Sequence, residues 1–543
     1  MVRFSQYVFS VLPLSSSFSK APKPTYVGNL NAFSVHDHLP TYAKSIAIVG
    51  SGSAGLAILK SLLDLPSDVR AGWDIVLFEQ RRDVGGIWLP DFNPPSPPAL
   101  PETPLYPQLM TNTPHPTMTY PGFPFPPNTP LFPRHEYVEQ YHVDYASYHN
   151  LTQFIRLNHT VHAAGWLGNN THGQWDLEIH QTSGNAIPVK IRRKFDHLVV
   201  ANGHNHYPRV PHWDGVSDWL SHSPLGAPKR ELLHSIFYRG PDQYKNATVV
   251  IVGSGASGRD AALQVGSVAK KAYQSLREGA DPTPGANVTA KPTISHFNFT
   301  SVIFSDGSSL ESVDAVISAT GYQYLVPFLT RAPSDSNANS VFVTSPDTDR
   351  NCTTATSLIT NTRYIFPLYQ HIFSLSPNLP PTALSFVGLP VLIANCPSDV
   401  AQALLLSHAL ADPSVLPSRQ RMLEDLIKRE NHLRSLGYDP YQVGHKLVGG
   451  DTEAQDYQDE LVEYLKTKKK LPDDGKKFVE QWRRDSRKYS FLLKRAWDRV
   501  VAIGEEDAWL DGVESEDQWA DMMTRLAKWQ EEWEEGGGID IAP

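Results

Sequence analysis

The fold is decided by a stretch near the N-terminus, residues 44–63, which reads KSIAIVGSGSAGLAILKSLL. Its apolar run at 46–49 predicts a short buried strand, and residues 54–65 have the apolar spacing of a helix. Residues 73–79, WDIVLFE, predict a second buried strand. A strand, a glycine-rich turn, a helix and another strand in this order form the βαβ unit that is typical of dinucleotide-binding folds.

The glycine-rich turn GSGSAG at 50–55 has the spacing that a pyrophosphate site needs, although such a turn also occurs without a ligand. The first glycine permits a tight turn, the second lets the backbone approach the phosphates, and the third lets the helix pack against the strand. The first turn of the helix offers free N–H groups and the positive end of its dipole. The residues expected to bind a cofactor here are Gly50, Gly52, Ser53, Ala54 and Gly55.

An acidic residue and a second glycine turn follow the second strand, in the segment EQRRDVGGIW at 79–88. Glu79 stands where a carboxylate accepts hydrogen bonds from a ribose hydroxyl. The paired glycines let the backbone approach a large cofactor, beside which an aromatic ring can pack, and NAD dehydrogenases do not need this second turn. We expect cofactor contacts from Glu79, Gln80, Gly86, Ile87 and Trp88.

The same design starts again at residue 247, where ATVVIVG at 247–253 predicts a strand and residues 256–268 predict a helix. The turn between them is GSGASG. It predicts a second dinucleotide site, formed by Gly253, Gly255, Ser257 and Gly258.

The second unit differs from the first at its sugar-reading position, which carries no acid. Arg277 ends the next predicted strand, 271–277, and Lys270 and Lys271 lie shortly before it. Cationic groups there suit the additional 2′-phosphate of NADP, which a carboxylate would repel, although a solvated basic patch is the alternative.

Two further apolar strands, predicted at 194–201 and 314–319, each end shortly before a glycine, Gly203 and Gly321. They have the form of matching connections between two nucleotide-binding units, the second inserted into the first. The Pro-rich stretch 90–133 predicts a long loop, because proline disrupts both helices and sheets. Further helices are predicted at 136–150 and after residue 413.

Taken together, the motifs resemble those of the flavin-containing monooxygenases, which are class B flavoprotein monooxygenases, in a fungal-type form. The segment 79–88 has this family's E-x-x-x-x-x-G-G-x-W pattern. Residues 106–126, YPQLMTNTPHPTMTYPGFPFP, resemble its stretch with a Thr-Asn pair. GSGASGRD at 253–260 and SATGY at 318–322 resemble its second fingerprint and its A-T-G-Y crossing.

The resemblance implies an enzyme that binds FAD and NADPH, in which NADPH reduces FAD and the reduced flavin captures O₂ as a C4a-hydroperoxyflavin. That intermediate oxygenates the nitrogen or sulfur of a small molecule, as in N,N-dimethylaniline monooxygenases. By the same resemblance Thr111 and Asn112 lie at the cofactors, and Asn112 is the one residue expected to act in catalysis, by holding the nicotinamide amide. The alternative for Asn112 is a turn residue in a Pro-rich loop.

Two departures from the family's pattern leave alternatives open. Asn202 stands in the first crossing where Thr is usual, and the F-x-G-x-x-x-H-x-x-x-[FWY] signature keeps only His234 and Tyr238, with Pro228 and Arg230 in place of Phe and Gly. A Baeyer–Villiger monooxygenase acting on ketones is therefore one alternative, and a non-catalytic scaffold derived from a flavoprotein is another. A disulfide reductase would need a redox pair, and the two cysteines, Cys352 and Cys396, are not one.

The predicted fold is α/β, with two Rossmann-like dinucleotide-binding domains, the NADP domain inserted in the FAD domain, and a helical C-terminal part. The expected boundaries are 1–43 for a leader or flexible segment, 44–208 and 320–412 for the two parts of the FAD domain, 209–319 for the NADP domain, and 413–543 for the helical region with its loose tail.

Composition limits the partners. A net charge of −9 argues against nucleic-acid binding, and no apolar run is long enough for a transmembrane segment. With two cysteines and scattered histidines, no metal site is expected. The expected partners are a small nucleophilic substrate and O₂, with the oligomeric state open. A weak leader at 1–43 and several N-glycosylation sequons, one at Asn351, leave both the cytoplasm and the secretory pathway possible.

Overall fold

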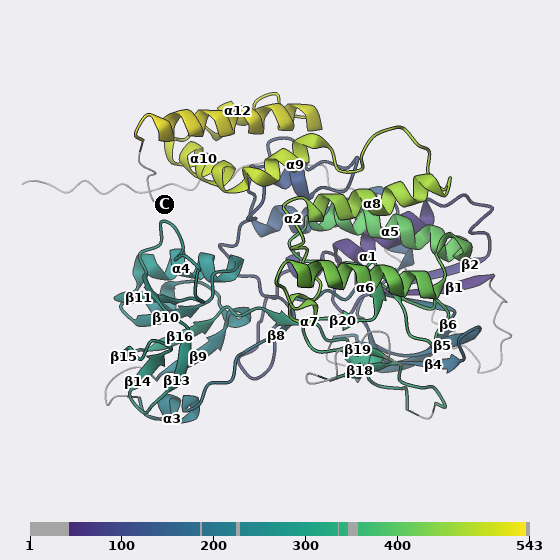
Figure 1. Ribbon diagram of the computed structural model, residues 1–543, viewed down its shortest axis with the longest axis horizontal. Coiled ribbons are helices and arrows are strands. Elements are labelled where there is room, and N and C mark those ends of the chain that lie inside the picture. The colour runs from purple at the N-terminus through teal and green to yellow at the C-terminus, as the bar shows by residue number, and fades with distance from the viewer. Residues whose placement is uncertain (1–42, 185–186, 224–228, 335, 346–356, 539–543) are drawn as a thin grey trace, which may run out of the picture. The chain divides into compact units, whose positions relative to one another are not determined.

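The structure, a computed structural model, describes residues 43–184, 187–223, 229–334, 336–345 and 357–538 (Figure 1). The expected leader, Pro228, the sequon at Asn351, Cys352 and the last residues of the tail lie outside this part of the chain. No helix in the described part is long and apolar enough to cross a membrane.

The first glycine turn belongs to a seven-stranded sheet in the order β21-β22-β23-β7-β1-β2-β3. Strand β1 lies inside the sheet between two parallel neighbours, β2 and β7, which explains its continuous apolar run. The strands of this sheet are β1 (Lys44–Val49), β2 (Trp73–Phe78), β3 (Ile155–Arg156), β7 (His197–Val200), β21 (Leu368–Tyr369), β22 (Phe373–Ser374) and β23 (Leu384–Phe386).

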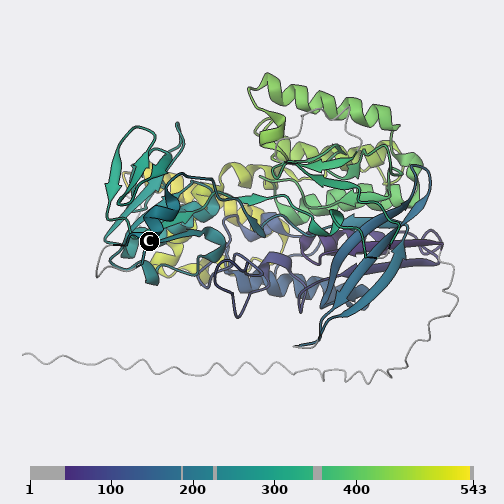
Figure 2. The same ribbon diagram turned by 90° about the horizontal axis from the view of Figure 1, so that it is seen from below.

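Helices cover one face of this sheet, and a smaller sheet packs against the other. In Figure 1, α1, α5 and α8 lie side by side, and α1 and α5 share an apolar core with β1. Figure 2 shows the antiparallel strands β4, β5 and β6 as a long curved ribbon beside the first sheet. The elements are α1 (Ser53–Leu63), α2 (His135–Tyr148), α5 (Asn395–Ala411), α6 (Arg419–Ser435), α7 (Pro440–Val443), α8 (Glu453–Thr467), β4 (His159–Gly168), β5 (Gly173–Gln181) and β6 (Val189–Phe195).

The strand predicted at 194–201 is two strands, which corrects that prediction. Residues 194 and 195 end β6, and β7 begins at His197 in the other sheet. Asp196 lies at the passage, where its carboxylate accepts hydrogen bonds from the Ser45 amide and hydroxyl, both at 2.8 Å. Because the chain stays extended on both sides of Asp196, the apolar pattern shows no break.

The second glycine turn belongs to a parallel sheet in the order β12-β11-β10-β16-β9. Its strands lie, along the sequence, between strands of the first sheet, and separate apolar clusters cover its two faces. The elements are α3 (Val216–Ser221), α4 (Ala256–Val268), β9 (Glu231–His234), β10 (Thr248–Val252), β11 (Lys271–Ser275), β12 (Thr289–Lys291), β16 (Ala315–Ser318) and the adjoining antiparallel β13 (Ile294–Phe297), β14 (Ser301–Phe304) and β15 (Ser309–Glu311).

The helical C-terminal region was correctly predicted, and its last helices pack on the Pro-rich loop. Leu131 and Phe132 of that loop share a core with α10 and α12, and Arg483 of α9 donates a hydrogen bond of 2.6 Å to the Pro116 carbonyl. The remaining elements are α9 (Gln481–Lys488), α10 (Ser490–Ile503), α11 (Glu506–Leu510), α12 (Glu516–Glu535), and the short strands β8 (Tyr207–Pro208), β17 (Tyr322–Gln323), β18 (Phe342–Thr344), β19 (Leu358–Thr360) and β20 (Ile365–Phe366).

Candidate functional site

The first glycine turn is packed too tightly for side chains at two of its positions. Gly50 has φ +104°, and a Cβ there would lie 2.5 Å from the Ala201 carbonyl oxygen, because β7 runs directly alongside. A Cβ on Gly55 would lie 1.8 Å from the Gly50 carbonyl oxygen. Helix α1 is thereby held against the end of β1, where its first turn opens toward the carboxyl ends of the strands.

The two glycine turns of the first unit face each other. Gly86 has φ +55°, and a Cβ there would lie 2.9 Å from the Gly52 Cα, while the Gly85 amide donates to the Ser51 carbonyl at 3.0 Å. Gly52 is the N-cap of α1, and no side chain in the described part of the chain caps the helix. The N–H groups of Ser53 and Ala54 at the start of α1 therefore suit a diphosphate.

Glu79 is buried, with 5% of its surface exposed, and braces the turn. Its Oε2 accepts hydrogen bonds from the Ser51 amide at 2.7 Å and hydroxyl at 2.9 Å, and its Oε1 accepts one from the Arg81 amide at 2.9 Å. A carboxylate oxygen has two acceptor sites, so Oε1 can also accept a bond from a ribose hydroxyl. Gln80, the next residue, is exposed.

Arg81 organises the turn at Gly85 and Gly86, a role that the sequence did not predict. The residue is 6% exposed, and its guanidinium donates to the carbonyls of Gly86 at 2.8 Å and Leu89 at 2.6 Å and pairs with Glu102 at 2.8 Å. These bonds fix the backbone on both sides of the half-buried Ile87 and Trp88. Arg82 is adjacent and exposed, so the sequence holds no signal for which arginine turns inward.

Asp399 was also missed, because α5 brings it to α1 from far along the chain. The residue is 3% exposed, and burial raises the pKa of its carboxyl group to about 7 against the opposing effect of the Ser53 hydroxyl. Its Oδ2 has no hydrogen-bond partner among the described residues. A Cβ on Gly388 would lie 2.8 Å from the Ala54 Cβ and 3.4 Å from Asp399 Oδ1, so the backbone after β23 also closes on this point. An unpartnered buried polar atom beside the first turn of α1 fits a polar ligand there.

Thr111 and Asn112 lie in the Pro-rich loop with different environments. Thr111 is buried, and its Oγ1 has no partner within the described ranges, although its amide donates to the Pro133 carbonyl at 2.9 Å. Asn112 is exposed, so its carboxamide is accessible to a ligand.

The second glycine turn repeats the packing of the first. Gly253 has φ +113°, and a Cβ there would lie 2.6 Å from the Ala319 carbonyl oxygen. A Cβ on Gly258 would lie 2.4 Å from the Gly253 carbonyl oxygen. Gly255 is the N-cap of α4 and, again without a side-chain cap in the described residues, leaves the amides near Ser257 open to an anion.

Arg277 lies two residues beyond β11, which ends at Ser275, and is exposed. Lys270 and Lys271 lie at the opposite end of that strand, which corrects their expected place beside Arg277: a strand rises about 3.3 Å per residue, so six residues separate the groups widely. Other cations take their place. Burial lowers the pKa of Lys446, and Arg277, Arg209 and Arg363 lower that pKa further by repulsion. This group of four cations favours a bound anion.

Comparison with known proteins agrees with this geometry. Residues 43–281 and 284–360 match the model of the family described as flavin-binding monooxygenase-like. The chain belongs to this family. It is accordingly an NADPH-dependent flavoprotein monooxygenase, and membership of the family implies FAD and NADPH as cofactors.

Several relatives of the family are similar over most of their length. The chain is 28% identical over 487 residues to the flavin-containing monooxygenase FMO GS-OX5 of Arabidopsis thaliana, covering 85% of this chain and 89% of the relative. It resembles the structure of S-allyl-L-cysteine S-oxygenase from Allium sativum with a TM-score of 0.66 and 25% identity, covering 89% and 99% of the two chains. Cyclohexanone monooxygenase shares the fold alone, with a TM-score of 0.51 and 11% identity over 79% and 99% of the chains.

The two residues that this monooxygenase keeps from the family's signature have structural positions. The His234 ring donates from Nε2 to the Gly321 carbonyl at 2.9 Å and accepts at Nδ1 from the Ile236 amide at 3.1 Å, and burial lowers its pKa to about 4, so it is neutral. Tyr238 donates to Gln264 of α4 at 2.9 Å. His234 thereby fixes the crossing at Gly321, and Tyr238 fixes the helix that follows the second glycine turn.

Proposed function

We propose that this monooxygenase uses NADPH and O₂ to oxygenate a heteroatom of a small molecule, and that a thioether sulfur is its preferred target. The observation that carries the proposal is the repeated glycine turn, each copy at the uncapped start of a helix and each at the carboxyl end of a parallel strand. Two such turns suit two dinucleotides, one for each cofactor that the family implies. When bound, FAD supplies the electron transfer and oxygen activation that no side chain can provide.

In this proposal the first unit, residues 44–208 and 320–412, holds FAD. The diphosphate lies at Gly52, Ser53 and Ala54, and Glu79 binds a ribose hydroxyl through Oε1. The inserted unit, residues 209–319, holds NADPH at Gly253, Gly255, Ser257 and Gly258, and Arg277 meets the 2′-phosphate. Asn112, exposed beside the buried Thr111 hydroxyl, presents its carboxamide to the nicotinamide without adding charge.

The preference for sulfur rests on the relatives. One similar structure is named as an S-oxygenase of S-allyl-L-cysteine, and it matches this chain over nearly its whole length. The likeness to cyclohexanone monooxygenase, at 11% identity, is a likeness of fold alone. The substrate therefore meets the cofactors as an uncharged nucleophile, for which the protein has to provide position and exclusion of water rather than an acid or a base.

The test is a substrate panel of matched size: an allyl thioether, a tertiary amine and a cyclic ketone. NADPH oxidation and O₂ uptake are followed together, and products are identified by mass spectrometry. We expect a sulfoxide, one oxygen heavier than the thioether, formed in near-equal amount to the NADPH consumed. An ester from the ketone with no sulfoxide would overturn the heteroatom assignment, and hydrogen peroxide with every substrate would overturn the oxygenase assignment.

A further inference from the structure

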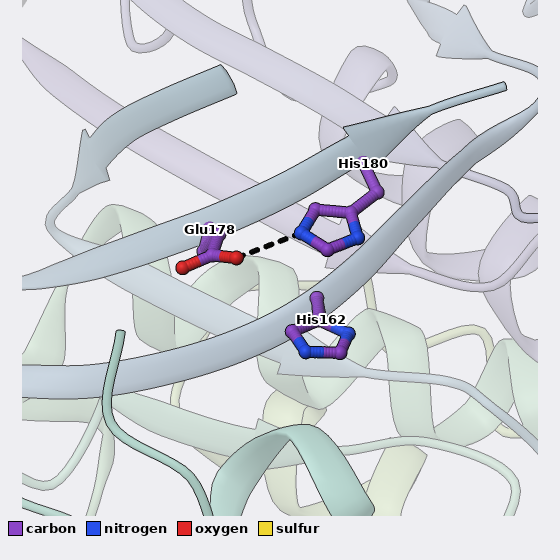
Figure 3. Close-up of side chains that lie close together, drawn as sticks. All are labelled: His162, Glu178 and His180. Atoms are coloured by element: carbon purple, nitrogen blue, oxygen red, sulfur yellow. Dashed lines mark hydrogen bonds and ion pairs between the residues drawn. The ribbon is translucent and has the colours of Figure 1, made fainter. Parts of the chain in front are cut away.

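Three potential metal ligands meet on the outer hairpin formed by β4 and β5, away from both glycine turns in the sequence. One ligand atom each from His162, Glu178 and His180 lies within 4.8 Å of the others. Figure 3 shows the His180 ring turned toward the Glu178 carboxylate, with His162 on the neighbouring strand. The Oε1 of Glu178 lies 2.7 Å from the Nε2 of His180, and the two imidazole rings stack with centroids 4.3 Å apart.

The geometry of the strands explains why His162, Glu178 and His180 lie close together. Glu178 and His180 are two residues apart on β5 and therefore point to the same face of the sheet. The pairing of β4 with β5 shifts between Val161 and Ala163, so His162 lies in the irregularity between them. Irregularities of this kind redirect a side chain, and here His162 joins the pair on β5.

The environment of Glu178 is unusual for a surface hairpin. The residue is 5% exposed, and a carboxylate so buried is costly unless it is compensated. Besides His180, the Ser334 hydroxyl donates to Oε2 at 3.2 Å, and the Nζ of Lys190 lies 3.6 Å from Oε1. Lys190 is 67% exposed, so its side chain can turn into solvent without losing buried contacts.

We propose that His162, Glu178 and His180 form a binding site for a divalent transition-metal ion of the zinc class, with water completing its coordination. Two imidazoles and one carboxylate are a ligand set that zinc accepts in proteins. Ligand atoms about 2.0–2.1 Å from one tetrahedral ion lie about 3.4 Å from each other, so small rotations of the two rings suffice to close the site. Lys190, and Arg331 near His162, add positive charge and keep the affinity moderate.

The metal would join β4 to β5 at the irregular point of their pairing. Val161 and Ile179, next to the ligands, face inward and pack in the core under the first sheet. The ion is therefore expected to stabilise this hairpin and to take no part in turnover. A site with this role responds to metal in a stability measurement and leaves coupled NADPH oxidation unchanged.

The experiment uses the full-length, flavin-loaded protein after treatment with a chelator. Zn²⁺ is titrated by calorimetry, and Co²⁺ is added in parallel because its visible d–d bands report nitrogen and oxygen ligation directly. The variants are His162→Gln and Glu178→Gln, which keep polar side chains of similar size. The control is His172→Gln, since His172 is exposed at the far end of the same hairpin.

We expect one Zn²⁺ per wild-type chain, a higher melting temperature with the ion, and Co²⁺ bands that both variants lose. Removal of an outer-sphere partner already weakens metal binding about 10- to 100-fold, so loss of a ligand should weaken it at least that much. The His172→Gln protein should bind like the wild type. Absence of binding by the wild type, or equal binding by all four proteins, would overturn the proposal.

Discussion

The buried carboxyl group at the start of α5 offers a sharp test of the site, because Asp399→Asn removes its charge and keeps its shape. Burial moves the pKa of Asp399 from 3.8 to about 7. A raised folded-state pKa means that the folded protein holds a proton the unfolded chain releases, so the contribution of this group to stability is greatest below pH 4 and falls as the pH rises toward 7. At about 1.4 kcal/mol per pKa unit, a shift of about three units lowers the free energy of unfolding by about 4 kcal/mol above pH 7.

The asparagine variant carries no such dependence. Relative to wild type, it should therefore gain about 2.5 kcal/mol in the free energy of unfolding between pH 5 and pH 8, since the wild type has already lost about 1.5 kcal/mol by pH 5. The site also predicts a binding effect. Above pH 7 the wild type carries an anion beside the first turn of α1, so its FAD affinity should fall with pH more steeply than that of the variant.

Urea unfolding at pH 5, 6, 7 and 8, in a fixed excess of FAD, measures the first effect, and flavin fluorescence titration measures the second. Asp281→Asn, at an exposed position, is the matched control and should follow the wild type at every pH. If the unfolding curves of Asp399→Asn and wild type change in parallel with pH, the carboxyl group is not held neutral by the fold, and the reasoning fails.

Three further predictions address the cofactors. Gly52→Val should yield colourless protein, because only a single Cβ fits at 3.5 Å from Gly86, and full flavin absorbance in that variant would contradict the assignment of this turn. Arg277→Ala should raise the KM for NADPH about ten- to a hundredfold and leave that for NADH nearly unchanged; an equal rise for both coenzymes would mean a structural role. Asn112→Ala should keep FAD and still oxidise NADPH, but release hydrogen peroxide and lose about 10²–10³ in coupled turnover. Wild-type coupling would make Asn112 a turn residue.

Local sequence signals were sufficient for the elements that carry the glycine turns. Strand β1, helix α1 and their repeats β10 and α4 were predicted within a residue or two, because each has its own apolar period and its own glycine stop. The boundary between β6 and β7 was missed because it lies at Asp196, which is held there by hydrogen bonds from Ser45 of another strand, β1. The pattern of apolar residues along the chain carries no information about a contact between strands of two different sheets.

For the candidate site, too, residues set by local sequence could be predicted, and residues set by distant contacts could not. The glycines could be predicted from the sequence, because backbone contacts within one βαβ unit require glycine at these positions. Arg81 and Asp399 could not be predicted, because their roles depend on which side chain turns inward and on which helix packs there from far along the chain. The histidines were described as scattered for the same reason, since an irregularity in strand pairing brings His162 to Glu178 and His180.

The two βαβ units differ at the residue that follows the second strand of each unit. The Gly50 amide donates to the Phe78 carbonyl, and the Gly253 amide donates to the Ser275 carbonyl, so these strands end in equivalent places. The next residue is Glu79 in the first unit and Leu276 in the second.

The Glu79 amide donates to the Arg156 carbonyl of β3 at 3.0 Å, and the Leu276 amide donates to the Lys291 carbonyl of β12 at 2.8 Å. Both side chains are buried. The second unit therefore replaces a buried carboxylate by an apolar side chain and follows it with the exposed Arg277 where the first has Gln80. Its turn is braced by a neutral group, since Gln274 donates to the Gly253 carbonyl at 3.0 Å. The geometry of the turn is thus kept while its negative charge is removed, which is the change that a coenzyme with an additional phosphate requires.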